Sequence, residues 1–153
     1  MQYLSMQKID TILEHFVRQW SGPLSRFALF LVYFWFGALK LVNASPANPL
    51  VADLLGRTLP FFSFSYFIVL LGIYEMAIGL TFIVPRLERL AIALLLPHLI
   101  MITAPIILLP AVTWSSMLVP TLEGQYIIKN LLIIALALQV VAHRHYFSKN
   151  ARS

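Results

Sequence analysis

With 153 residues, of which 60% are hydrophobic and only 11% are charged, the chain has too little polar surface to coat a water-soluble domain. Its formal net charge of +5 comes from Lys and Arg residues that flank apolar segments, and this pattern excludes nucleic acid as an expected partner. Cysteine is absent, so disulfides, thiol catalysis and iron–sulfur ligation within the chain are excluded. We therefore expect a single integral membrane domain over residues 1–153, with the lipid bilayer as its surroundings.

Residues 3–20 are predicted to form an amphipathic helix. Apolar side chains recur at helical spacing along one stripe, and charged side chains lie opposite it. The stripe consists of Ile9, Ile12, Leu13, Phe16, Val17 and Trp20. Two interpretations remain open: the helix lies on the membrane surface, or it packs against the rest of the protein. The run Ser21-Gly22-Pro23 is expected to end this helix.

Four apolar segments follow, each long enough to cross a bilayer whose core is about 30 Å thick. They cover residues 27–44, 64–84, 90–112 and 126–142, and a short amphipathic stretch over 51–59 lies between the first two. Prolines and basic residues end the segments. The predicted fold class is all-α: a four-transmembrane-helix bundle with an N-terminal amphipathic interfacial helix.

Basic residues near the ends of the spans predict the orientation, because Lys and Arg accumulate on the cytoplasmic side. The opposite loops hold only Arg57. The other side holds eight basic residues: Lys8, Arg18, Arg26, Arg86, Arg89, Arg144, Lys149 and Arg152. We expect both termini to be cytoplasmic. A bacterial inner membrane is expected only from the family resemblance given below.

Four ionisable residues lie within the predicted spans: Lys40, Glu75, His98 and Lys129. Such groups cost about 2.5–3.5 kcal/mol each in the bilayer, so they are expected to face the bundle interior in pairs. At about 1.5 Å of rise per residue, Glu75 and His98 both lie near the middle of the membrane. An ion pair between Lys40 and Glu75 would satisfy both groups, either to fix the register of two helices or to serve a function. Lys129, taken alone, is expected to reach the outer headgroups.

Glu75 has Gly72 and Gly79 on the same helical face, which lets a neighbouring backbone approach and points the carboxylate inward. A glutamate buried without full pairing could exchange protons, whereas a permanent pair would hold it ionised. His98 follows Pro97, which removes a backbone hydrogen bond and either kinks the span or opens it onto a cavity. His98 is the only deep imidazole, so neither a haem nor a metal site is expected.

Aromatic residues are frequent in the first span, where Tyr33, Phe34, Trp35 and Phe36 are consecutive. With Tyr66, Tyr74 and Trp114 they could form a pocket for a flat ring such as a quinone. The simpler interpretation is that they are ordinary lipid-facing and interfacial aromatic side chains.

Three sequence motifs resemble the DoxX-like membrane proteins. They are Phe34-Trp-Phe-Gly-Ala-Leu-Lys40 with Ser45-Pro-Ala47, Gly72-Ile-Tyr-Glu75 with Gly79, and Pro120-Thr-Leu-Glu-Gly-Gln-Tyr-Ile-Ile-Lys-Asn130. The resemblance implies a small four-helix membrane protein, linked in some members to quinone-dependent oxidation of sulfur compounds or to respiratory oxidases. The matching positions are Trp35, Gly37, Lys40, Glu75, Gly79, Glu123, Gly124, Lys129 and Asn130. The lack of cysteine argues against sulfur chemistry.

Three functions follow from these observations. In the first, a redox-associated subunit binds a quinone, and its candidate catalytic residues are Glu75 and Lys40. Its ligand-binding residues would be Lys40, Glu75, Lys129, Trp35, His98 and Asn130, and a redox partner protein or a second copy would complete it. In the second, the kinked third span with His98 belongs to a small-molecule or proton-coupled transporter. In the third, the chain is a scaffold or assembly factor whose ion pair only fixes helix register.

Overall fold

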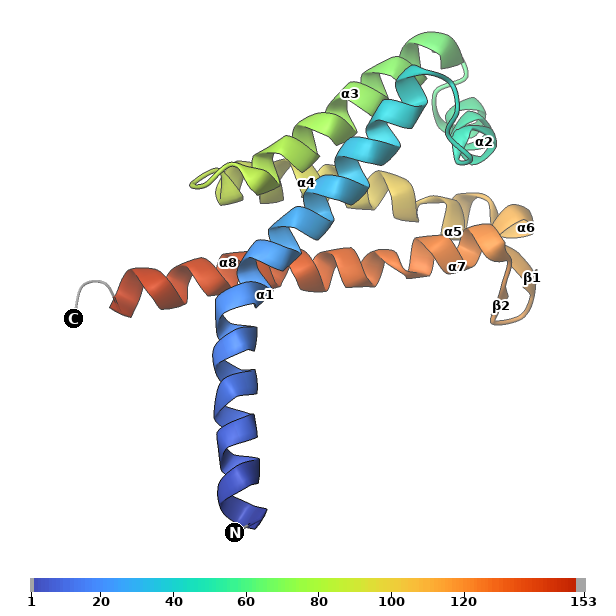
Figure 1. Cartoon of the computed structure of the whole chain (residues 1–153). Helices are drawn as coiled ribbons and strands as arrows, with labels where there is room; N and C mark the ends of the chain where they lie inside the picture. The colour runs from blue at the N-terminus through green and yellow to red at the C-terminus, as the bar shows by residue number, and fades with distance from the viewer. Residues whose placement is uncertain (1, 151–153) are drawn as a thin grey trace.

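The computed structural model describes the backbone of residues 2–150 and the side chains of residues 9–142. Helices dominate this part of the chain, and one short β hairpin interrupts them (Figure 1). The elements are α1 (Gln2–Leu41), α2 (Asn48–Thr58), α3 (Phe64–Ile83), α4 (Glu88–Thr103), α5 (Pro105–Leu108), α6 (Pro110–Thr113), β1 (Trp114–Ser116), β2 (Val119–Pro120), α7 (Leu122–Ile128) and α8 (Asn130–Asn150). The all-α fold class is confirmed.

Four stretches of the described chain are long and apolar enough to cross a membrane: Ile9–Leu41, Phe64–Ile83, Glu88–Leu108 and Leu122–Ala142. They correspond in order to the four predicted spans. The connection between α3 and α4 lies at one end of the bundle with the C-terminal part of α8, and α2 and the hairpin lie at the other end (Figure 1). Successive connections therefore lie at opposite ends of the bundle, as they must if the chain crosses the membrane four times. The chain is a multi-pass membrane protein.

The predicted end of a first helix at Ser21-Gly22-Pro23 is wrong, because α1 continues through these residues to Leu41. Proline lacks a backbone donor and crowds the preceding turn, so inside a helix it produces a kink, and here it does not end the helix. The hydroxyl of Ser25 donates to the carbonyl oxygen of Ser21 at 2.7 Å, a contact that also favours bending. Figure 1 shows α1 changing direction after its N-terminal part.

The N-terminal part of α1 does not pack against the bundle over the residues whose side chains are described. It stands clear of the other helices and, in the view of Figure 1, runs across the direction of α8. Its apolar stripe is 51–67% exposed at Ile9, Ile12, Leu13, Phe16, Val17 and Trp20. The interpretation in which this segment packs on the rest of the protein is therefore wrong, whereas an interfacial position accounts for the exposed stripe.

The core lies between α1, α3, α4 and α8. Its largest fully buried side chains include Leu29, Ile78, Phe82, Leu95 and Val140. Outside this core, large apolar side chains point outward along all four spans, and Ile100 of α4 is 72% exposed. A water-soluble protein does not expose apolar surface on this scale, so the outer face is suited to lipid.

The third and fourth spans are less regular than predicted. Pro105 and Pro110 begin the separate short helices α5 and α6, because a proline is well accommodated in a first helical turn and poorly in a helix interior.

The β hairpin that follows was not predicted from the sequence. Thr121 accepts a hydrogen bond from the Gly124 backbone and donates one to the Val112 carbonyl at 2.7 Å. A side chain at Gly124 would collide with the Thr113 carbonyl, so the glycine is required here.

A buried Lys–Glu–His triad as the candidate site

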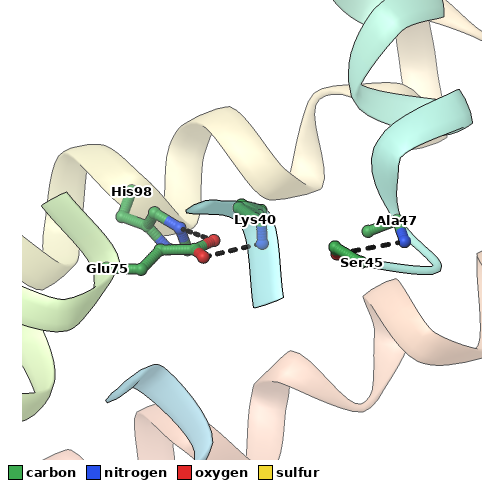
Figure 2. A network of polar contacts seen from close by, with 5 residues as sticks. All are labelled: Lys40, Ser45, Ala47, Glu75 and His98. Carbon is green, nitrogen blue, oxygen red and sulfur yellow. Dashed lines mark hydrogen bonds and ion pairs between the residues drawn. The ribbon is translucent and has the colours of Figure 1, made fainter. Parts of the chain in front are cut away.

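Three of the four intramembrane ionisable residues meet in the interior of the bundle. Lys40 comes from the last turn of α1, Glu75 from the middle of α3 and His98 from α4. Lys40 Nζ donates to Glu75 Oε2 at 2.6 Å, and His98 Nε2 lies 3.0 Å from Glu75 Oε1. Figure 2 shows the carboxylate between the two nitrogen-bearing side chains. The predicted ion pair between Lys40 and Glu75 is present, and His98 adds a third member.

The three residues of the triad are almost completely buried inside the protein: Lys40 is 4% exposed, Glu75 6% and His98 3%. A buried charge without a partner is strongly unfavourable, whereas a paired and hydrogen-bonded one is tolerated. A protonated lysine, an ionised glutamate and a neutral imidazole together carry no net charge. The structure thus pairs a basic and an acidic side chain with an imidazole inside an apolar bundle.

Glycines allow the helices to approach closely enough for this pairing. A Cβ atom on Gly72 would lie 2.7 Å from the Gly37 carbonyl oxygen, and one on Gly79 would lie 2.9 Å from the Phe34 nitrogen. Both distances are shorter than real Cβ contacts, so α1 and α3 can only cross this tightly because these positions lack side chains. The predicted role of the glycines that flank Glu75 is confirmed.

Two tyrosines hold the imidazole in place. The Tyr33 ring meets the His98 ring edge to face with centroids 5.3 Å apart, and the Tyr74 ring lies at 6.1 Å. The Tyr74 hydroxyl also donates to the Leu94 carbonyl at 2.6 Å, one turn before His98 and next to the Pro97 defect. From the sequence, both tyrosines were expected only as members of a group of aromatic residues. Tyr33 could have been found from its spacing, because it precedes Lys40 by seven residues on one helical face.

The hydrogen bonds around the imidazole indicate which nitrogen carries its proton. A carboxylate paired with the Lys40 ammonium can only accept hydrogen bonds, so in this arrangement His98 Nε2 is the donor. In a neutral imidazole the remaining nitrogen, Nδ1, is then an acceptor. His98 Nδ1 and the Tyr33 hydroxyl are both buried without a hydrogen-bond partner in the described structure. The site therefore has one carboxylate with both oxygens occupied and one free basic nitrogen.

Three of the predicted ligand-binding residues lie elsewhere. Trp35 is 59% exposed and points from the face of α1 opposite Lys40. Lys129 is exposed between α7 and α8, where its ammonium lies 5.0 Å from the Tyr126 ring centroid, a cation–π contact. Asn130 is half-buried at the start of α8. The contacts to Glu75 in the described structure come from Lys40 and His98.

Two shallow apolar hollows lie on the outer faces of the spans. One, of about 350 Å³, is lined by α1 residues that include Phe34 and Trp35. The other, of about 430 Å³, is lined by residues of the α4–α5 region that include Ile100 and Ile107. Neither hollow is lined by Lys40 or Glu75. Phe34 and Trp35 of the first span thus line an outer hollow, whereas Tyr33 of the same helix contacts His98.

A second ion pair, which was not anticipated, joins α1 to the start of α4. Arg26 donates to the carboxylate of Glu88 and, through its other terminal nitrogen, to the Phe82 carbonyl at 3.0 Å. Glu88 is buried, and the main-chain nitrogen of Arg86 also donates to it at 3.4 Å. Arg26 was interpreted only as a topology signal. The guanidinium also fastens the α3–α4 connection to the first span.

The site and the fold define a small multi-pass membrane protein with a buried Lys–Glu–His triad. The chain matches no protein-family model, and comparisons with curated proteins and with solved structures find no match either. The resemblance to DoxX-like proteins stays a prediction that depends on the motifs alone.

Proposed function

We propose that this protein is a proton-handling membrane subunit associated with quinone-linked redox chemistry. The observation that carries the proposal is the contact between His98 Nε2 and Glu75 Oε1 at 3.0 Å, with Lys40 on the other carboxylate oxygen. An imidazole held by a carboxylate is suited to gain and lose a proton, because the carboxylate stabilises the imidazolium form. Ionisable groups inside a membrane typically serve proton or ion pathways.

In this proposal each member of the triad has a separate task. Lys40 keeps Glu75 ionised, Glu75 fixes the tautomer of His98, and His98 accepts the mobile proton at Nδ1. The described residues bring no electron carrier to the site, so electrons come from a redox partner protein. Reduction of a quinone consumes protons, and a buried imidazole could supply them at the depth where quinones dissolve. The DoxX-like motifs support the quinone-linked setting.

The proposed location is a bacterial inner membrane, with both termini in the cytoplasm. The eight basic residues on one side of the predicted spans, against Arg57 on the other, support the orientation, and the DoxX-like motifs support the bacterial inner membrane. A second copy of the chain is the proposed alternative to a redox partner, since the outer faces are broadly apolar.

The experiment is to purify the protein in mild detergent and to quantify extracted quinone per protein by mass spectrometry. Lys40→Ala and Glu75→Gln are compared with the wild type, and Glu14→Gln, at an exposed carboxylate, is the matched control. We expect close to one quinone per protein in the wild type and in Glu14→Gln. In Lys40→Ala and Glu75→Gln we expect the bound quinone to be lost, with the comparison made on equal amounts of folded protein. Quinone at lipid background in every sample would contradict the quinone-linked part of the proposal.

A second candidate is a proton-coupled transport component. It is favoured by the position of His98 directly after Pro97 inside α4, because a buried ionisable side chain within a membrane helix commonly marks a proton or substrate path. Purified protein in liposomes, loaded with a pH-sensitive dye and given a potassium diffusion potential, distinguishes the two. Proton entry that His98→Gln abolishes would support transport, whereas tight liposomes would exclude it.

A further inference from the structure

Two buried polar atoms next to the triad have no hydrogen-bond partner: the Tyr33 hydroxyl and His98 Nδ1. Both residues are 3% exposed, so bulk water does not reach them. Buried polar groups in folded proteins are almost always hydrogen-bonded, because an unbonded one keeps the cost of leaving water. Two such atoms on adjoining side chains therefore require an explanation.

The two atoms have complementary hydrogen-bonding roles. The contact of His98 Nε2 with Glu75 makes Nδ1 the acceptor of the neutral imidazole, while a tyrosine hydroxyl both donates and accepts. The two rings are in edge-to-face contact at 5.3 Å, yet the hydroxyl and Nδ1 do not bond each other. A small molecule that donates to Nδ1 and accepts from the hydroxyl would satisfy both.

The neighbouring polar groups are already engaged. Both oxygens of Glu75 are bonded, Lys40 donates to one of them, and the Tyr74 hydroxyl donates to the Leu94 carbonyl. The two unbonded atoms therefore have no free polar side chain of the triad or Tyr74 to bond, and a buried water is usually held by polar groups that are otherwise unsatisfied.

We propose that the Tyr33 hydroxyl and His98 Nδ1 bind one water molecule, which bridges α1 and α4. The inference rests on the proposed function and deepens it, because the bridge puts a hydrogen-bond donor on the nitrogen that receives the proton. It extends the chain of polar groups from Lys40 through Glu75 and His98 to Tyr33. Tyr33 is thus a positioning residue that acts on His98 through the bound water.

The first test is the thermal stability of Tyr33→Phe in lipid nanodiscs. If the hydroxyl is unbonded, its removal leaves the Tm unchanged or raises it; if it holds a bridging water, its removal lowers the Tm. We expect a lower Tm for Tyr33→Phe and an unchanged Tm for the control Tyr66→Phe, whose side chain is exposed. An equal or higher Tm for Tyr33→Phe would overturn the inference.

The second test is nitrogen NMR of labelled histidine at a fixed alkaline pH at which the imidazole is neutral, with His98→Gln used to assign the resonance. We expect the Nδ1 resonance of His98 to be that of a hydrogen-bonded nitrogen and to move towards the unbonded position in Tyr33→Phe. A lower Tm with an unchanged Nδ1 resonance would assign the hydroxyl to another partner and overturn the inference. Because the measurement needs no proton uptake, its outcome is independent of the proposed function.

Discussion

Gly37 of α1 and Gly72 of α3 meet backbone to backbone, directly beside the Lys40–Glu75 pair. A Cβ atom on Gly37 would lie 2.6 Å from the Gly72 carbonyl oxygen, and the reverse distance is 2.7 Å. The opposing atoms are backbone atoms that cannot rotate away. This crossing sets the separation of the two helices and therefore the length that the lysine has to span.

A methyl group at this crossing should destabilise the protein. We expect Gly72→Ala to lower the free energy of unfolding by about 1–3 kcal/mol, because the two helices must move apart. The control is Gly56→Ala in α2, where a Cβ meets nothing within 4 Å and helix propensity predicts a gain of about 0.5–1 kcal/mol. Thermal unfolding in the same detergent measures both. Equal effects of the two variants would contradict the close crossing.

Breaking the buried ion pair on one side should cost much more than removing it altogether. Lys40→Met leaves the Glu75 carboxylate without its cation, and loss of one partner of a buried pair typically costs about 3–5 kcal/mol. The double variant Lys40→Met/Glu75→Leu removes both charges, and we expect it to recover most of that loss. Denaturant titration of the three proteins gives the comparison.

The same double variant tests whether the triad has a function. If the charges only fix helix register, the folded double variant keeps the cellular phenotype of the wild type. Loss of the phenotype in a protein of wild-type stability is what the proposed function predicts. A double variant as unstable as Lys40→Met would mean that the pair itself is required for folding.

The contact of Arg26 with Glu88 should stabilise the α3–α4 connection. Because the Arg26 side chain is 22% exposed, the penalty of breaking the pair is partly screened. We expect Arg26→Leu to lower the free energy of unfolding by about 1–3 kcal/mol and to speed amide exchange near Phe82. The exposed Arg57, replaced by Leu, serves as the control. Unchanged exchange in Arg26→Leu would show that the connection is held by other contacts.

The N-terminal part of α1 should lie in the membrane interface. Because the chain has no cysteine, single cysteines can be introduced without a background. In liposomes we expect Glu14→Cys to react readily with a water-soluble maleimide and Phe16→Cys to react at least several-fold more slowly. Disruption of the bilayer with detergent should abolish the difference. Equal rates in intact liposomes would place the stripe in water.

Sequence reasoning found the four spans because each is a long apolar segment with its own ends. The Lys40–Glu75 pair could also be predicted, because residue spacing gives the depth of both side chains in the membrane and places Gly72 and Gly79 on the same helical face as Glu75. It placed His98 at the right depth, but its contact with Glu75 depends on how α3 and α4 are rotated towards each other. No local pattern encodes that rotation.

The remaining differences have the same origin. The helix was expected to end at Ser21-Gly22-Pro23, but α1 continues through these residues. A proline only kinks a helix when the turns on either side of it keep their hydrogen bonds. The burial of Glu88 was not predicted, because it depends on the position of Arg26 on a helix that is distant in sequence. Lys129 and Trp35 were grouped with the triad by depth and composition, whereas their helical faces direct them elsewhere.

The most direct test of the central claim is the nitrogen NMR spectrum of His98 in lipid bilayers as a function of pH. The account predicts that the resonances change reversibly from the neutral, Nε2-protonated tautomer to imidazolium on acidification, while the protein stays folded. A His98 that keeps its neutral spectrum at every pH at which the fold persists would contradict proton handling and leave the triad a structural feature.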